Sequence, residues 1–316
     1  MDSSKNFFYL YSGLGGPLGF AYKEQLEGID NSLGFRSSDC DLLDKNMTHD
    51  FFLKVQQNFP EKFITYVHLA AVSGGSHLSE KVPATLFVDN IQMAINSLNA
   101  CQINGISRVI LVLSTACYSP DINDPNESNL HMLPIKSSEY GYAYAKRMFE
   151  VLMRAYNKQY GMKISCVLVN GIIGANMNFN PEKSILPAAL IKKFVDNKLN
   201  DSIIELWGDG TPIREYTSSK DLARAIKWCV LNQQSDTLLN IGNTSKISVQ
   251  ELAYLIADII GIDRRRIKFT GQVSYGKQIQ ATNNAKFRAL SNFLYSNITE
   301  AIKEAIESYT STATVE

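Results

Sequence analysis

Residues 7–19 read FFYLYSGLGGPLG, an apolar run followed by a turn that carries three evenly spaced glycines. The apolar run 7–11 predicts a buried β-strand, and Pro17 suits the first turn of a helix that continues to about residue 26. Glycines in such a turn let a pyrophosphate approach the helix N-terminus. A glycine-rich turn without a ligand is the alternative. We take as cofactor-binding residues Gly13, Gly16 and Gly19.

The first half of the chain repeats this order of strand and helix. Strands are predicted at residues 33–35, 63–69, 108–113 and 163–169, and helices at 48–59 (capped by Thr48), 85–104 and from Tyr142 onward. This alternation predicts an α/β protein with a Rossmann-type, doubly wound parallel sheet. We assign residues 1–171 to this Rossmann domain.

After residue 172 the alternation gives way to longer loops at 174–182 and 207–215. Amphipathic helices are expected near residues 221–231, 249–260 and 299–308, and the tail after Tyr309 is expected to fray. We therefore assign residues 172–316 mainly to a smaller C-terminal α/β substrate lobe, with the chain free to cross back to the first sheet.

Charge and cysteine content narrow the functional class. The 316 residues include 31 basic and 31 acidic side chains, so no basic surplus points to nucleic acid or to a membrane surface. Five scattered cysteines are typical of reduced thiols, and no group of cysteines and histidines predicts a metal site. No signal-peptide pattern and no apolar run of membrane-spanning length are apparent, so we expect a cytoplasmic protein.

Tyr142 and Lys146 lie four residues apart at the start of a predicted helix, and therefore on one helical face. An ammonium beside a phenol stabilises the phenolate, so we expect Lys146 to lower the pKa of Tyr142 from about 10 toward neutrality. Such a phenol donates its proton readily to a carbonyl oxygen as hydride reaches the carbon. Ser114, at the end of an upstream strand, completes a candidate catalytic set for carbonyl reduction. Alone, the Tyr–Lys spacing is a weak signal.

The end of the second strand bears on the choice of nicotinamide cofactor. An acidic residue there usually binds the ribose 2′-hydroxyl of NAD, whereas here Arg36 is followed by two serines. A guanidinium with neighbouring hydroxyls suits the 2′-phosphate of NADP. We therefore expect NADP(H), while Asp39 and Asp41 keep NAD(H) open.

Further motifs give the chain a family resemblance. Besides the glycine pattern and the candidate catalytic set, they are HLAAVSGG at 68–75, GYAYAKRM at 141–148, QYG at 159–161, NFNP at 178–181 and WGDGTPIRE at 207–215. With these motifs the chain resembles the extended short-chain dehydrogenases/reductases, and among them the GDP-L-fucose synthases, between residues 7 and 310. The resemblance implies an oxidoreductase with a Rossmann lobe for NADPH and a second lobe for a GDP-linked 4-keto-6-deoxy sugar. It also implies a homodimer formed through the Tyr142 helix and its predecessor.

The same resemblance implies roles for individual residues. Ser114 would hydrogen-bond the keto oxygen, Tyr142 would deliver the proton, and Lys146 would hold the nicotinamide ribose. Tyr142 and Lys146 would thus also contact the cofactor, together with Arg36, Asp41, Leu42, Leu69, Ala70 and Ala71. The implied substrate-binding residues are Thr115, Asn170, Trp207, Arg214 and Lys277. Ordinary packing of Trp207 and a surface ion pair of Arg214 are the alternatives.

The pattern of the family breaks where it would epimerise the sugar with a cysteine base and a histidine acid. The base position, two residues after the catalytic serine, falls on Ala116. Counting back from Pro120 would instead make it Cys117, with Thr115 as the hydroxyl. No histidine follows the motif at 178–181. Near the diphosphate, Ile279 replaces a basic residue, for which Lys277 is a possible substitute.

These departures set our expectation of function. We expect an NADPH-dependent C4-reductase of a GDP-4-keto-6-deoxy-hexose or -heptose in the synthesis of surface glycans, without 3,5-epimerase activity. One alternative is a bifunctional GDP-L-fucose synthase that uses Cys117 and an unrecognised acid. The other is a nucleotide-sensing protein that keeps the fold without catalysis.

Overall fold

The computed structural model describes residues 6–29, 31–135, 139–232, 235–271 and 281–313. At its centre is a six-stranded parallel sheet in the order β2-β1-β3-β4-β5-β9. Its strands are β1 (Phe7–Tyr11), β2 (Ser32–Gly34), β3 (Phe63–His68), β4 (Arg108–Ser114), β5 (Lys163–Val169) and β9 (Leu238–Asn240). Because β2 lies on one side of β1 and β3 on the other, the strand order reverses beside β1. Open α/β sheets bind their ligands at such a reversal.

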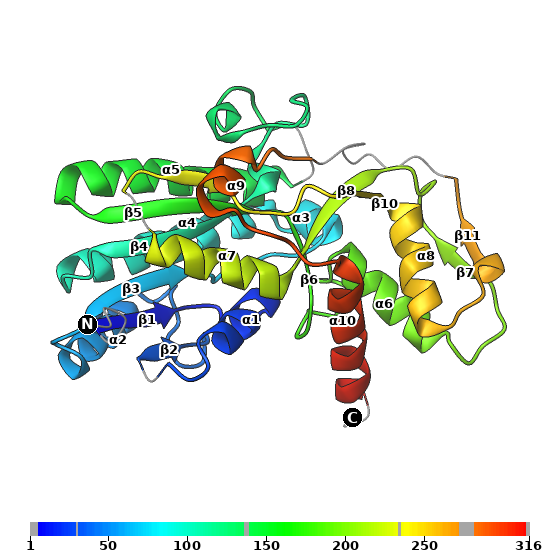
Figure 1. Ribbon diagram of the computed structural model, residues 1–316, viewed down its shortest axis with the longest axis horizontal. Coiled ribbons are helices and arrows are strands. Elements are labelled where there is room, and N and C mark those ends of the chain that lie inside the picture. The colour runs from blue at the N-terminus through cyan, green and yellow to red at the C-terminus, as the bar shows by residue number, and fades with distance from the viewer. Residues whose placement is uncertain (1–5, 30, 136–138, 233–234, 272–280, 314–316) are drawn as a thin grey trace.

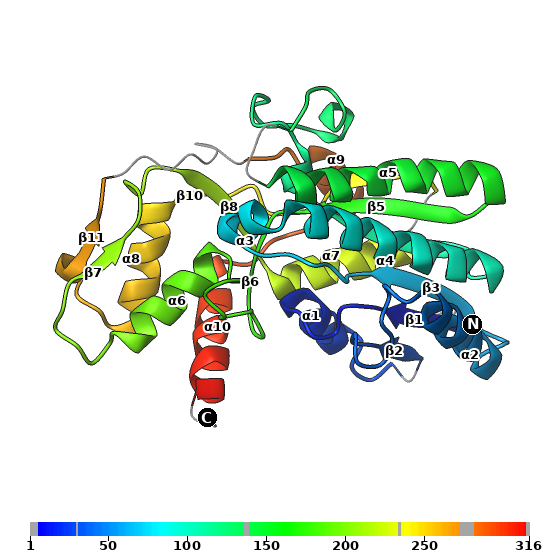
Figure 2. The ribbon, with the colours of Figure 1, turned by 180° about the vertical axis from the view of Figure 1, so that it is seen from behind.

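Helices cover both faces of this sheet, so the expected Rossmann-type fold is confirmed (Figures 1 and 2). On one face lie α1 (Pro17–Gln25) and α7 (Ser219–Leu231). On the other lie α2 (Lys45–Asn58), α4 (Pro83–Ile103) and α5 (Tyr140–Tyr160), with the short α3 (Ser76–Lys81) before α4. The connection from β4 to α5 contains two 3-10 turns, η2 (Thr115–Cys117) and η3 (Glu127–Asn129).

A second lobe begins where the chain leaves β5. There β6 (Gly171–Ile173) pairs in parallel with β8 (Ile213–Ser218), and β10 (Lys246–Ser248) pairs with β8 in antiparallel. A separate core joins α6 (Leu186–Asp196), α8 (Val249–Ile260), α10 (Ile298–Ala313) and the paired strands β7 (Ile204–Leu206) and β11 (Ile267–Phe269), with η4 (Arg264–Arg266) before β11 (Figure 1). The segments α7, β9 and α9 (Ala285–Ser291) return to the main sheet, so residues after 172 contribute to both lobes.

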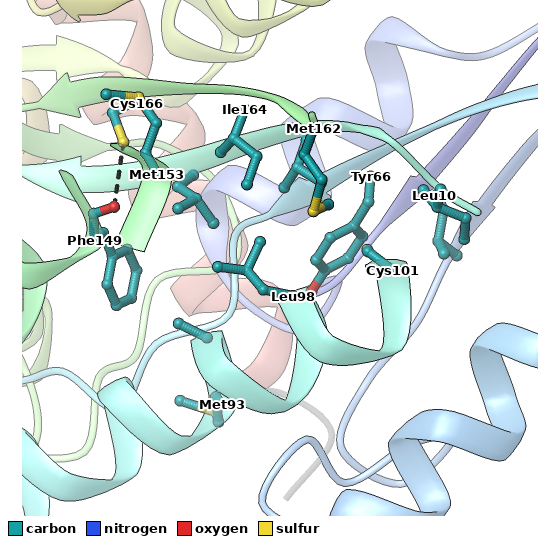
Figure 3. Close-up of a cluster of buried hydrophobic side chains, with 14 of the residues drawn as sticks. Leu10, Tyr66, Met93, Leu98, Cys101, Phe149, Met153, Met162, Ile164 and Cys166 are labelled. Atoms are coloured by element: carbon teal, nitrogen blue, oxygen red, sulfur yellow. Dashed lines mark hydrogen bonds between the residues drawn. The ribbon is translucent and has the colours of Figure 1, made fainter. Parts of the chain in front are cut away.

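The main sheet is buried on both faces, which explains why its strands read as continuous apolar runs. Successive residues of β3 point to opposite sides. Tyr66 packs under α4 and α5, whereas Val67 packs toward α1 and α7. Figure 3 shows the hydrophobic core under α4 and α5. In it the Cys166 thiol lies 3.7 Å from the Phe149 carbonyl oxygen of α5.

The N-terminus of α2 differs from the prediction. The cap is Asp44, whose carboxylate accepts the N–H groups of Asn46 and Met47, each at 2.9 Å. Thr48 lies one turn inside the helix, and its hydroxyl donates to the Asp44 carbonyl at 2.7 Å. The expected cap at Thr48 is therefore wrong, because an aspartate with extended backbone precedes it and satisfies two otherwise unpaired donors.

Two further expectations in the second lobe are corrected. Residues 213–215 belong to β8 rather than to a loop, because pairing with β10 holds them in a sheet. Residues 310–313 of the tail do not fray, since α10 continues to Ala313, while residues 314–316 lie outside the described residues. The Tyr309 hydroxyl donates to the Asp196 carboxylate of α6 at 2.6 Å and so anchors this last turn.

Some kinds of site do not occur in the described ranges. Within them, no helix combines the length and the apolar character that crossing a membrane requires. Among the same residues, no three His, Cys, Asp or Glu side chains gather as a set of metal ligands. All five cysteines are buried free thiols.

Candidate active site

The glycine turn between β1 and α1 lies directly against the end of β3. Gly13 has a left-handed φ of +75°, and a Cβ there would come within 2.8 Å of the Ala70 main-chain nitrogen. A Cβ on Gly19 would collide with the Gly13 carbonyl. The Ser12 hydroxyl accepts the Ala70 N–H at 3.1 Å. Only glycine therefore fits at position 13, where the chain after β1 touches the chain after β3, and at position 19, where α1 packs against the glycine turn itself.

Gly15 and Gly16 face open space instead. A Cβ on Gly15 would meet no described protein atom within 4 Å, and one on Gly16 would meet the Gly13 carbonyl only at 3.7 Å. Protein packing does not require their small size, which leaves the backbone before α1 uncovered. Backbone N–H groups at a helix N-terminus bind phosphates. These residues therefore fit the pyrophosphate of the predicted dinucleotide.

The residues predicted to select the nicotinamide cofactor follow β2. Arg36 is exposed, and its main-chain N–H donates to the Asp39 carboxylate at 2.8 Å. The Asp41 carboxylate accepts the Leu43 N–H at 3.0 Å. The carboxylates of Asp39 and Asp41 are thus hydrogen-bonded to nearby backbone N–H groups. This favours the Arg36 guanidinium as the group that binds the 2′-phosphate of the cofactor ribose. The Leu42 side chain is only 4% exposed and packs in the core, and its contact with the cofactor stays a prediction.

Several predicted residues meet at the carboxyl edge of the main sheet. Leu69, Ala70 and Ala71 follow β3, Ser114 ends β4, and Tyr142 lies in the first turn of α5. The Ser114 hydroxyl lies beside the Tyr142 phenol, close enough to lower its pKa in part. The structure thus brings the serine and the tyrosine of the candidate catalytic set into direct contact, with β3 between them and the glycine turn.

The pKa of Tyr142 moves in the direction opposite to the expected one. Burial raises this pKa well above its ordinary value of 10.0. Nearby Cys117 and Glu139 raise it further, and the Ser114 hydroxyl lowers it only in part. The expectation of a phenol near neutrality is therefore wrong, because a phenolate in this place loses its hydration. Tyr142 therefore stays protonated and has a proton to donate.

Lys146 is buried as well, with 2% of its surface exposed. Its ammonium donates to the Val112 carbonyl of β4 at 3.0 Å and lies 4.5 Å from the centroid of the Phe149 ring. Burial lowers the pKa of Lys146 to about 8, although the Cys117 and Cys166 thiols raise it in part. The lysine therefore carries its charge at neutral pH and is held by the backbone of β4, the strand that ends at Ser114.

Asn170, between β5 and β6, is bonded to the protein through both atoms of its amide. Its Nδ2 donates to the Asn243 carbonyl at 2.6 Å, and its Oδ1 accepts the Thr217 hydroxyl at 2.6 Å. A Cβ on Gly242 would lie 2.5 Å from the amide carbon. Asn170 thus joins the two lobes, and its contact with substrate stays a prediction.

The other predicted substrate residues differ in their surroundings. Arg214 of β8 is half-buried, and burial lowers its pKa while Tyr216 and then Glu139 raise it. Because Glu139 directly precedes α5, Arg214 faces the helix that carries the catalytic tyrosine. Trp207 is 90% exposed, whereas Thr115 is buried in η2. Lys277, like Ile279, lies outside the described residues.

Glu215, next to Arg214 on β8, is a buried acid that our sequence analysis missed. It is 3% exposed, and its Oε2 accepts the Thr282 hydroxyl at 2.9 Å. Its Oε1 has no hydrogen-bond partner within the part of the chain that the structure describes. Burial raises the pKa of Glu215 to about 7, although hydrogen bonds from Thr282 and Asn170 lower it in part. Side chains two residues apart on a strand point to the same face, so the position of Glu215 two residues before buried Thr217 could have indicated that it is buried.

Ala116 and Cys117 are consecutive residues of η2, and their side chains pack in different clusters. Ala116 packs with Ile135 beside Tyr142. Cys117 is fully buried in the core under α5, and its carbonyl accepts the Arg147 guanidinium at 2.9 Å. The Ala116 side chain thus packs in the cluster that includes Tyr142, whereas the Cys117 side chain, although near enough to raise the pKa of Tyr142, packs in the core under α5.

Comparison with known sequences places these features in a family. A sequence model of the NAD dependent epimerase/dehydratase family matches residues 21–242. The GDP-L-fucose synthase of Dictyostelium discoideum is 30% identical over 307 residues, which cover 94% of this chain and 93% of that protein. The GDP-L-fucose synthase of Escherichia coli (strain K12) is 29% identical over 268 residues, which cover 80% and 81% of the two chains.

Solved structures show the same likeness. A GDP-L-fucose synthetase from Naegleria fowleri bound to NADP superimposes with a TM-score of 0.85 at 26% identity, over 98% of this chain and 95% of that one. A GDP-mannoheptose C4 reductase from Campylobacter jejuni with NADP bound superimposes with a TM-score of 0.82 at 20% identity, over 97% and 99% of the chains. The second likeness shows a shared fold.

Because Gly19 is tightly packed and Gly15 faces open space, replacing each of them by alanine should have different effects. Gly19→Ala forces a Cβ into the Gly13 carbonyl and should lower the melting temperature by roughly 5 °C or more. Gly15→Ala has room and should leave the melting temperature within about 1 °C, while it weakens NADPH binding about tenfold by crowding the phosphate site. Thermal unfolding and fluorescence titration with NADPH measure both effects. Equal melting temperatures, or unchanged affinity in Gly15→Ala, would contradict this assignment.

Glu215 should make stability depend on pH. Its folded-state pKa of about 7 exceeds the ordinary 4.5, so its stabilising contribution is complete below pH 4.5 and is lost as the pH rises through 7. Relative to Glu215→Gln, the wild type should lose about 2 kcal/mol of unfolding free energy between about pH 5.5 and about pH 8. Urea unfolding at both values measures this, with exposed Glu205→Gln as the control. Parallel pH profiles for wild type and Glu215→Gln would refute it.

Proposed function

We infer that this chain, which belongs to the NAD dependent epimerase/dehydratase family, is an NADP(H)-dependent reductase of nucleotide sugars. Within that activity we propose reduction at C4 of a GDP-4-keto-6-deoxy-hexose or -heptose, in deoxysugar synthesis for surface glycans. We also propose that 3,5-epimerase activity is lost. The GDP linkage is supported by the GDP-L-fucose synthases among the relatives.

The contact between Ser114 and Tyr142 is the observation that carries this proposal. It lies at the edge of the sheet where the glycine turn fits a dinucleotide. NADPH bound along that turn would supply a hydride. A carbonyl reductase needs a proton donor and an orienting hydroxyl near that hydride, and these two side chains meet the requirement.

The chain's own residues handle the proton. Tyr142 gives its phenolic proton to the keto oxygen, and the Ser114 hydroxyl orients the same oxygen by a hydrogen bond. The C4 carbonyl gains a hydride at carbon and a proton at oxygen, becoming a secondary alcohol, and the tyrosine becomes a phenolate. The positive charge of Lys146, one helical turn away, stabilises that phenolate, which burial otherwise disfavours.

Two positions support the loss of epimerisation. Ala116 stands where the family places its base, and a methyl group accepts no proton. The segment 182–186 contains no histidine, and neither a serine nor a lysine readily replaces an imidazole as the acid of an epimerase. The alternative is a bifunctional enzyme with Cys117 as the base. Complete burial of the Cys117 side chain counts against that alternative.

For the sugar nucleotide, we propose that Arg214 binds the diphosphate. A planar guanidinium binds phosphate oxygens in pairs, and partial burial strengthens the charge interaction. Thr115, Asn170 and Trp207 remain proposed contacts of the same ligand. The exposed indole of Trp207 would gain cover from a bound ligand.

Incubation with GDP-4-keto-6-deoxy-mannose and NADPH in deuterated water tests the reaction and its limits. We expect NADPH oxidation and a C4 alcohol without deuterium at C3 or C5, because no base removes those protons. Loss of NADPH absorbance and NMR of the product measure both. Deuterium at C3 or C5 would refute the loss of epimerisation. If neither this sugar nor a heptose counterpart oxidised NADPH, the reductase itself would be refuted.

Variants connect the reaction to its residues. Tyr142→Phe should lower kcat about 100-fold or more with NADPH affinity unchanged, since only the proton donor is lost. Tyr160→Phe, at the exposed far end of α5, is the matched control. Under our proposal, neither the wild type nor Cys117→Ser incorporates deuterium at C3 or C5 of the sugar. Under the bifunctional alternative, the wild type incorporates deuterium and Cys117→Ser does not.

We further propose a homodimer formed through α4 and α5. Their outer faces carry exposed apolar side chains, with Phe87 38%, Val88 56% and Val151 46% exposed. An apolar groove between the two helices is lined at its ends by Pro83 and Met148. Two copies related by a twofold axis would bury these faces in a four-helix bundle.

The oligomeric state tests this interface. Wild type should sediment as a dimer of the 35.3 kDa chain, and Val88→Glu should sediment as a monomer because it buries a charge in the proposed contact. Leu199→Glu, at a 97% exposed position of the second lobe, is the control and should stay dimeric. A monomeric wild type, or a Val88→Glu dimer of unchanged affinity, would disprove the interface.

A further inference from the structure

His68, the last residue of β3, is fully buried and has no part in the reaction proposed above. Its Nδ1 lies 2.9 Å from the Tyr66 hydroxyl, which in turn lies 3.0 Å from the Ser12 hydroxyl. Ser12 also accepts the Ala70 N–H. A hydrogen-bonded chain therefore connects His68 with the backbone that packs against the glycine turn.

The other nitrogen of this imidazole is unusual. Nε2 is buried, yet it has no hydrogen-bond partner among the residues that the structure describes. An unpaired buried polar atom costs folding free energy, and native proteins keep few of them. His68 therefore calls for an explanation beyond packing.

The Lys146 ammonium lies close to His68. Both groups pack against Phe149, the ammonium 4.5 Å and the imidazole centroid 5.6 Å from the centroid of its ring. Phe149 and Tyr66 line the same side of the sheet (Figure 3). Lys146 donates to the carbonyl of Val112, the residue after the one that pairs with His68 in the sheet. The ends of β3 and β4 thus bring the amine and the imidazole together.

Burial and the neighbouring charge together keep the imidazole neutral. Burial, aided by the charge of Lys146, lowers the pKa of His68 to about 3, so the ring is neutral and carries one N–H. An N–H on Nε2 would add a donor beside a cation. An N–H on Nδ1 donates to Tyr66 instead, lets the Tyr66 hydroxyl donate to Ser12, and leaves a lone pair on Nε2.

We propose that His68 is a positioning residue for the catalytic lysine, its Nε2 lone pair stabilising the nearby Lys146 ammonium electrostatically. The ammonium itself is hydrogen-bonded to the Val112 carbonyl, and no hydrogen bond joins it to Nε2 among the described residues, so the two groups interact at longer range. Through Tyr66 and Ser12, the imidazole is held at a set distance from the glycine turn. The inference rests on the role of Lys146 in the proposed function, but its test requires no turnover.

Titration of Lys146 by NMR tests the proposal. In protein labelled with ¹³C at the lysine ε-carbons, loss of a signal in Lys146→Met assigns the resonance, whose wild-type midpoint is expected near pH 8. His68→Phe keeps an aromatic ring and removes the Nε2 lone pair, so the midpoint should fall by about one unit. Tyr66→Phe frees the tautomer of His68 and should lower the midpoint by a smaller amount.

The controls separate this effect from general disturbance of the core. Ser97→Ala removes another hydroxyl, 3.3 Å from that of Tyr66, and should leave the Lys146 midpoint unchanged. The variants retain the other titratable groups near Lys146 and Tyr66, which are the thiols of Cys117, Cys166, Cys101 and Cys40.

The outcomes are distinct from those of the activity assay. An unchanged or raised Lys146 midpoint in folded His68→Phe overturns the proposal. Should that variant fail to fold, an unchanged midpoint in Tyr66→Phe overturns it equally. A protein that reduces no nucleotide sugar but shows the expected midpoints would refute the proposed function and leave the placement of the lysine by His68 standing.

Discussion

The contact between the ends of β1 and β3 is the constraint on which the rest of the site depends. Gly13 lies so close to the main chain at Ala70 that no side chain fits between them. Hydrogen bonds through Ser12 and Tyr66 cross the same junction, so the neighbouring strand positions the glycine turn. The next strand, β4, ends at Ser114. A parallel sheet gathers these short motifs because all its strands end at one edge.

Burial then determines the charge of the groups gathered there. It raises the pKa values of Tyr142 and Glu215 and lowers those of Lys146 and His68, in each case favouring the neutral form. A protonated phenol is the form that a ketone reductase needs before hydride transfer, and the nearby ammonium matters for the phenolate that follows. The spacing of Lys146 and Tyr142 along the helix was therefore not enough to predict the pKa of the tyrosine, because it left out the free-energy cost of removing a phenolate from water.

The first 170 residues were predictable because each element shows its own pattern. Buried parallel strands such as β4 and β5 read as apolar runs, and glycine marks the turn after β1. The second lobe was harder, because strands of three residues such as β6 and β10 are too short to show a period. The ordered end of α10 depends on Tyr309 meeting Asp196, a contact between residues far apart in the chain.

The amino-acid sequence by itself determined the fold class, the glycine turn, the Ser114, Tyr142 and Lys146 set and the family resemblance, because all of these depend on local spacing. Only the tertiary structure decided that Lys146 bonds the backbone of β4, that Glu215 is buried, and that one nitrogen of His68 has no hydrogen-bond partner among the described residues. The physical reason is that burial and its pKa shifts depend on which distant segments pack together, and residue spacing does not contain that information.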